Sequence, residues 1–171
     1  MNKSRQVEPW LRGTLSELPA VQRAVIHALQ LAEEDLNRWC ADLTREEFNV
    51  RPAEVASVAF HIQHIARSVD RLLTYAEGRS LSEAQWSGLS SELAPDAEPS
   101  LVFQELRIAV ARAMERVRKI SSADLDEKRA VGRQSLPTSV GGLLVHIAEH
   151  TQRHVGQAIT TAKVVRPART S

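Results

Sequence analysis

The distribution of glycine and proline constrains the fold of this chain more than any other feature. The 171 residues contain only seven of each, and they cluster, so that long stretches between the clusters contain neither. Both residues disfavour the interior of a helix, glycine because of its conformational entropy and proline because it lacks the backbone donor. The pattern therefore predicts long helices separated by polar connections.

Apolar residues recur at spacings of three and four in four of these stretches, as expected for amphipathic helices. We predict a first helix from residue 19 to about 43 and a second from about 55 to 76. The third begins near residue 99, continues through 117 and is ended by residues 121–124, and the fourth runs from about 138 to 164. Helices of matched length, each roughly 33–40 Å at 1.5 Å per residue, favour an all-α fold in the form of a four-helix bundle.

The connections between these helices differ in length and character. The segment TREE at residues 44–47 matches a capping box, which predicts one short helical turn after the first helix. Residues 79–99 form a long polar stretch that also contains Leu81, Trp86, Leu89 and Leu93. A connection of this length usually crosses from one end of a bundle to the other or carries function. A polar connection to Pro137 precedes the last helix, and no alternating β-strand pattern or internal repeat is present.

The balance of charge argues against nucleic acid as a partner. Lysine and arginine number 22 against 21 aspartate and glutamate, whereas a nucleic-acid interface is usually clearly basic. The basic tail at residues 163–169 places its charges at a chain end, where side chains are usually solvated.

The single cysteine, Cys40, excludes an internal disulfide, and we expect it to be a small buried hydrophobe in a reducing compartment. The first residues lack the apolar segment of a signal peptide, and no window approaches about 20 consecutive apolar residues. We therefore expect a cytoplasmic protein with one domain over residues 1–171. Its core would span about residues 15–165, between a short polar leader and the basic tail.

Histidines are the residues of this chain that most clearly indicate chemistry. His27 is expected at a polar position of the first helix or in the bundle interior. The other five form two groups, which are His61 with His64 on the second helix and His146, His150 and His154 on the fourth. Residues four apart on a helix share a face, so the His-x-x-x-His spacing suits a pair of metal ligands.

The last two histidines lie within the apolar stripe of the fourth helix. At roughly 100° per residue the stripe spans about 80° and contains Leu143, Ile147, His150, His154 and Ala158. A buried imidazole needs partners for both ring nitrogens, which a metal ion on one and a hydrogen-bond acceptor on the other provide. The alternative is a pair of hydrogen-bonded core or cleft histidines without an ion.

Periodicity does not decide which histidine of the second helix faces the interior of the bundle. The apolar residues between 55 and 73 centre on a direction closer to His61 than to His64. His61 is therefore the easier core residue, whereas His64 turns inward only if helices cover both of its flanks. Both alternatives remain on this reasoning.

Two motifs resemble those of the DinB-like family. The sequence HIARSVDRL, which starts at His64, resembles the second-helix motif of the family, a histidine followed by a small residue and a polar pair. The sequence HIAEHTQRHVGQ, which starts at His146, resembles the last-helix motif, in which His-x-x-x-His leads into Gly-Gln. The resemblance covers about residues 15–165. It implies a four-helix bundle with a long crossover connection.

The resemblance also implies a metal site. The family's triad corresponds to His64, His150 and His154, and three imidazoles leave open coordination positions, as in catalytic rather than structural sites. Zinc or nickel is the expected ion, with iron or manganese as alternatives. The residues expected to line the site or to hold its ligands are His61, His146, Glu149, Arg67 and Arg153.

The function implied by the resemblance is broad. Some relatives are thiol-dependent, so we expect a metal-dependent transferase that uses a low-molecular-weight thiol, or a hydrolase, acting on a small molecule. Candidate bases are Asp70, Glu77 and Glu149, and candidate contacts for an anionic thiol are Arg67, Arg71 and Arg153, all of which are otherwise solvated surface charges. The alternative is a non-catalytic helical interaction domain with structural histidines. A homodimer is expected.

Overall fold

The computed structural model describes residues 7–91 and 96–166, without the side chains of residues 89–91. The first six residues of the polar leader, Leu93 of the long connection and residues 167–169 of the basic tail therefore lie outside the described residues, as does the side chain of Leu89.

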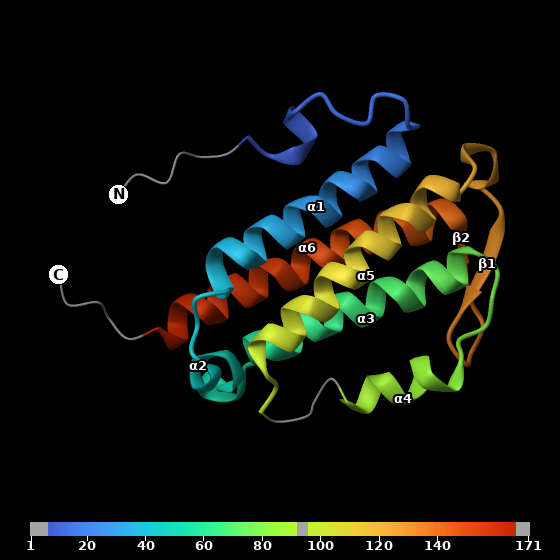
Figure 1. The fold of residues 1–171 in the computed structure, drawn as a ribbon. Coiled ribbons are helices and arrows are strands. Elements are labelled where there is room, and N and C mark those ends of the chain that lie inside the picture. The colour runs from blue at the N-terminus through green and yellow to red at the C-terminus, as the bar shows by residue number, and fades with distance from the viewer. Residues whose placement is uncertain (1–6, 92–95, 167–171) are drawn as a thin grey trace.

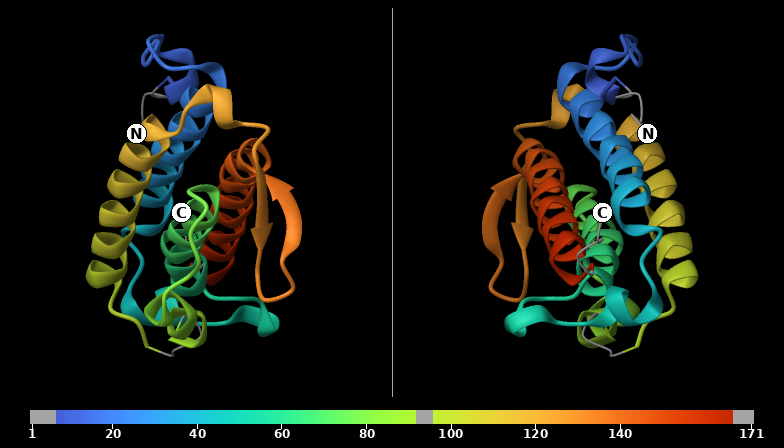
Figure 2. Two further views of the ribbon diagram at one scale, coloured as in Figure 1. Left: turned by 90° about the vertical axis from the view of Figure 1, so that its right-hand side faces the viewer. Right: turned by 90° about the vertical axis from the view of Figure 1, so that its left-hand side faces the viewer.

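Four long helices dominate the described part of the chain, as predicted. They are α1 (Ala20–Cys40), α3 (Val58–Ala76), α5 (Pro99–Lys119) and α6 (Val140–Val165). Each packs against two others in the order α1, α6, α3, α5 and back to α1. Figure 2 shows this arrangement nearly end-on, with the four helices around one interior. The observed ends differ from the predicted ones by up to three residues, because capping side chains and prolines set them more sharply than periodicity does.

The order of the helices requires one long crossover, as expected. Helices α3 and α5 run in the same direction, opposite to α1 and α6, so the chain returns along the bundle between them (Figure 1). This return contains α4 (Glu83–Ser91), a helix that the sequence analysis did not predict. The reciprocal bonds at its start, Gln85 N to Ser82 Oγ and Ser82 N to Gln85 Oε1, form a capping box. That motif is visible in the sequence and would have located the helix.

A small hairpin, which the sequence analysis did not predict, precedes α6 in the otherwise helical fold. Strands β1 (Lys128–Val131) and β2 (Leu136–Ser139) pair antiparallel, with Lys128 opposite Ser139. Four residues a strand are too few for an alternating pattern to stand out. The hairpin lies beside the end of α3 (Figure 1), where Arg129 Nε donates to the carbonyl of Ala76 at 2.9 Å.

The connection after α1 contains α2 (Arg45–Asn49), which begins with the predicted capping box. Thr44 Oγ1 accepts from the backbone N–H of Glu47, and the carboxylate of Glu47 accepts from that of Thr44. Phe48 of this helix is fully buried and lies against Phe103 of α5. Short 3₁₀ turns occupy Pro9–Leu11, Pro52–Glu54 and Ser122–Asp124.

The core lies between the four long helices and is formed mainly by aliphatic side chains. Its largest fully buried hydrophobic members are Phe48, Ile26, Leu29, Leu36, Ile62, Ile65, Leu73, Leu106, Leu144 and Ile147. Cys40 is buried as predicted, and burial raises the pKa of its thiol to about 12. No helix in the described part of the chain is both long and apolar enough to cross a membrane.

Candidate metal centre

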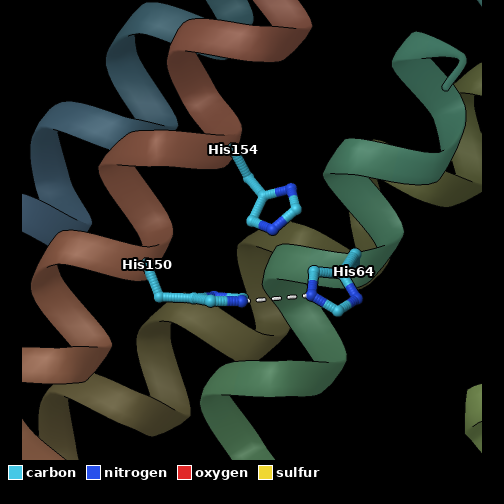
Figure 3. A group of neighbouring side chains, drawn as sticks. All are labelled: His64, His150 and His154. Carbon is cyan, nitrogen blue, oxygen red and sulfur yellow. Dashed lines mark hydrogen bonds between the residues drawn. The ribbon is translucent and has the colours of Figure 1, made fainter. Parts of the chain in front are cut away.

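Antiparallel packing of α3 and α6 brings three histidines together in the bundle. His64 projects from α3, and His150 and His154 project from successive turns of α6 (Figure 3). One ring nitrogen from each can be chosen so that all three lie within 4.8 Å of one another. The Nε2 atoms of His64 and His150 are 3.2 Å apart. All three side chains are half-buried, so the group is neither sealed in the core nor fully exposed.

This geometry fits a divalent ion. Two nitrogens that each lie 2.0–2.1 Å from a tetrahedral ion are separated by about 3.3 Å, close to the 3.2 Å between the Nε2 atoms of His64 and His150. Figure 3 shows a ring nitrogen of His154 facing the same space. Among the described residues, His64, His150 and His154 form a group of side chains whose ligand atoms could hold an ion together.

The two histidines of α3, His61 and His64, have different surroundings in the structure. His61 is 4% exposed and lies behind the triad, where its Nδ1 is 3.0 Å from Nδ1 of His154. His64 is the one that faces His150. Periodicity therefore identified the more buried histidine, whereas the family motif identified the member of the group.

Phe60 is a site residue that the sequence analysis missed. Its ring stacks on His64 with centroids 5.4 Å apart and an interplanar angle of 14°. It also meets His61 and His154 edge-on, at 5.4 and 6.4 Å. Phe60 precedes His64 by four residues, so the shared helix face would have indicated the contact. The ring restricts the orientations open to His64.

The remaining residues of α6 expected at the site lie at its outer edge. His146 Nδ1 is 2.7 Å from Glu149 Oε1, and the His146 ring centroid is 5.4 Å from that of His150. Glu149 also pairs with Arg153 at 3.5 Å. These three side chains are 43–56% exposed, so they border the site on its solvent side.

Two of the candidate bases belong to a different cluster. Arg116 of α5 donates to Asp70 at 2.6 Å and to Glu77 at 2.7 Å. Burial would raise the pKa of Glu77, but hydrogen bonds from Arg116 and Arg79 outweigh it and lower that pKa overall. Both carboxylates are thus held in ion pairs with Arg116, which leaves Glu149 as the candidate base beside the histidines.

The two arginines of α3 that were candidate contacts for an anionic thiol also lie in different surroundings. Arg67 donates to Glu105 of α5 at 2.7 Å, so it forms an interhelical ion pair. Arg71 is 8% exposed and lies close enough to His150 for its charge to contribute to the lower pKa of that ring.

His27 is also buried, but it contacts Thr14 beneath the N-terminal segment and is not part of the triad.

Burial keeps three histidines, His61, His150 and His154, neutral. Loss of solvation, followed by repulsion from neighbouring rings, lowers the pKa of His61 and His150 to about 4 and that of His154 to about 3. At neutral pH these rings therefore have unprotonated nitrogens available, as metal binding requires. Nδ1 of His150 is buried without a hydrogen-bond partner among the described residues.

These shifts predict that the metal-free protein loses stability in mild acid. The unfolded chain protonates its histidines below about pH 6.5, whereas the folded chain resists protonation of His61 and His150 until about pH 4. The free energy of unfolding should therefore fall as pH drops from 6.5 towards 4. Thermal melts at half-unit intervals from pH 7.5 to 5 measure this, and an unchanged Tm would contradict it. Glu33 and Asp35 act in the opposite direction, because burial raises their pKa values.

Comparison with known proteins adds a family to this geometry. Residues 28–158 match the family model described as the DinB superfamily, and this range includes the whole triad. Comparison with curated proteins finds no significant match.

Proposed function

Because this chain belongs to the DinB superfamily, we propose that it binds a divalent metal ion through His64, His150 and His154 and uses it in small-molecule chemistry. The observation that carries the proposal is the convergence of three imidazoles, two of them with Nε2 atoms 3.2 Å apart. Zinc or nickel is the proposed ion, since imidazole nitrogen suits both, and iron and manganese are the alternatives.

An ion held by three imidazoles keeps open positions, where it can lower the pKa of a thiol or of water. We propose that the reaction is a transfer to or from a low-molecular-weight thiol, or a hydrolysis. Half-burial of the triad supports this, because the three side chains are neither sealed in the core nor fully exposed.

The chain also offers a residue that can hold a proton beside the triad. A Glu149 carboxylate 2.7 Å from Nδ1 of His146 favours the tautomer with its proton on Nδ1. Nε2 of His146 is then an acceptor at the solvent edge of the site. In the proposed reaction, His146 accepts the proton that the thiol or water gives up, and Glu149 stabilises the charged ring.

Metal content tests the first part of the proposal. Protein purified without a histidine tag should contain about one equivalent of zinc or nickel per chain by elemental mass spectrometry. Dialysis against a strong chelator should remove the metal and lower the Tm, because an ion that binds only the folded state stabilises it. Substoichiometric metal that readdition does not restore would contradict a metal site and favour a non-catalytic interaction domain.

Activity is tested on the reconstituted protein. The metal-loaded protein is incubated with a panel of low-molecular-weight thiols and an electrophilic acceptor. It should consume free thiol faster than the chelator-treated protein does. A parallel panel of ester and amide substrates tests hydrolysis. Turnover that is equal with and without metal would contradict a metal-dependent reaction.

A further inference from the structure

His61 has contacts that the proposed metal site does not explain. It is 4% exposed and lies outside the group of nitrogens that can share an ion. Its Nδ1 is 3.0 Å from Nδ1 of His154. Its other nitrogen, Nε2, is buried and has no hydrogen-bond partner among the described residues.

The contact between His61 and His154 requires one shared proton. Two neutral imidazoles can hydrogen-bond through their Nδ1 atoms only if one donates and the other accepts. If Nε2 of His154 faces an ion with its lone pair, the proton of His154 is on Nδ1, and this N–H donates to Nδ1 of His61. The proton of His61 is then on Nε2, where no described residue accepts it.

In this arrangement the two nitrogens of His61 have opposite effects: the unpaired Nε2–H lowers stability, and Nδ1 orients the ring of His154. A buried N–H without a partner is unfavourable, and an aliphatic side chain of similar size would pack in its place without this cost. The hydrogen bond to His154, in contrast, fixes both the rotation of its ring and the nitrogen that faces His64 and His150. Phe60, which lies edge-on to both rings, restricts the pair further.

We propose that His61 is a positioning residue, which accepts a hydrogen bond from Nδ1–H of His154 and so directs Nε2 of His154 into the triad. This inference rests on the proposed metal site. It predicts a separation of two effects, since removing the acceptor should weaken metal binding without destabilising the metal-free fold. A buried histidine with a purely structural role would show the reverse.

Two variants of His61 test this proposal with Zn²⁺ as the probe. His61→Leu removes the acceptor, whereas His61→Asn places an amide oxygen near the position of Nδ1. Competition with a chromophoric chelator should show Zn²⁺ affinity about 10–100-fold weaker for His61→Leu, the typical effect of losing a partner that orients a ligand. His61→Asn should recover to within a few-fold of wild type. The metal-free His61→Leu protein should melt at or above the wild-type Tm.

A matched control is His27→Leu, which makes the same change at a histidine that is 6% exposed and lies outside the triad. Its Zn²⁺ affinity should equal that of wild type. Long-range ¹H–¹⁵N spectra of the zinc-loaded wild type should show His154 as the Nδ1–H tautomer, and the His154 signals should broaden or divide in His61→Leu.

The results distinguish this inference from the proposed function. Wild-type protein that binds no Zn²⁺ overturns both. Wild-type binding with equal affinity in His61→Leu overturns the positioning role alone. The positioning role is also overturned if His61→Asn binds Zn²⁺ as weakly as His61→Leu does. It is overturned as well if X-ray absorption counts four imidazoles in wild type and three in His61→Leu, since His61 would then be a ligand.

Discussion

Replacing His150 with alanine is expected to lower Zn²⁺ affinity by at least about 100-fold, more than the loss of an orienting partner usually costs. His150 contributes the nitrogen that lies 3.2 Å from Nε2 of His64, so its loss leaves two ligands on different helices. The fold should persist, because the alanine removes a half-buried ring whose Nδ1 has no partner among the described residues. Chelator competition measures the affinity, and circular dichroism of the metal-free protein checks the fold.

His146→Ala is the matched control for this prediction. The two histidines are neighbours on α6, with ring centroids 5.4 Å apart, but His146 lies outside the triad and contacts Glu149 instead. We expect its Zn²⁺ affinity to change by less than about threefold, well inside the 10-fold that one outer partner typically controls. Equal losses in both variants would show that the change in α6, rather than the ligand, decides binding.

Phe48→Ala is expected to destabilise the protein by about 3–5 kcal/mol, the usual cost of emptying a fully buried aromatic position. Phe48 is fully buried, and its ring centroid is 6.0 Å from that of Phe103. The phenylalanine therefore anchors the short helix α2 in the core, and its loss leaves a cavity there. Urea denaturation followed by circular dichroism measures the change in the free energy of unfolding.

Val50→Ala provides the comparison for Phe48→Ala. Val50 follows the same short helix but is 43% exposed, so its truncation should change the free energy of unfolding by no more than about 0.5 kcal/mol. A loss below about 1 kcal/mol for Phe48→Ala would mean that α2 packs only loosely on the bundle. In that case the capping box at Thr44 would be a local turn without a role in the core.

The sequence by itself determined what depends on neighbouring residues. Helix periodicity and the placement of Pro19 and Pro99 located the four long helices, because an amphipathic stripe and a helix start are local properties. The same reasoning placed His150 and His154 on one face of α6, since residues four apart cannot avoid sharing a face. The local pattern at residues 44–47 likewise gave the capping box of α2.

Tertiary structure alone decided the contacts between helices. Periodicity favours His61 over His64 as the inward-facing residue, and the packing of α3 against α6 puts His64 beside His150 and His61 beside His154. The same holds for Asp70, a candidate base in sequence terms that Arg116 holds from another helix. The charge and apolarity of a residue can be known from the chain, but its partner depends on how the helices dock.

The histidine triad combines both kinds of information. The pair on α6 is set by helix geometry, whereas the third ligand comes from 86 residues earlier in the chain, and its Nε2 lies 3.2 Å from that of His150. A separation of that size carries no periodic pattern. The sequence therefore determined that two histidines would face the interior together, and the docking of α3 on α6 determined which other histidine would face them.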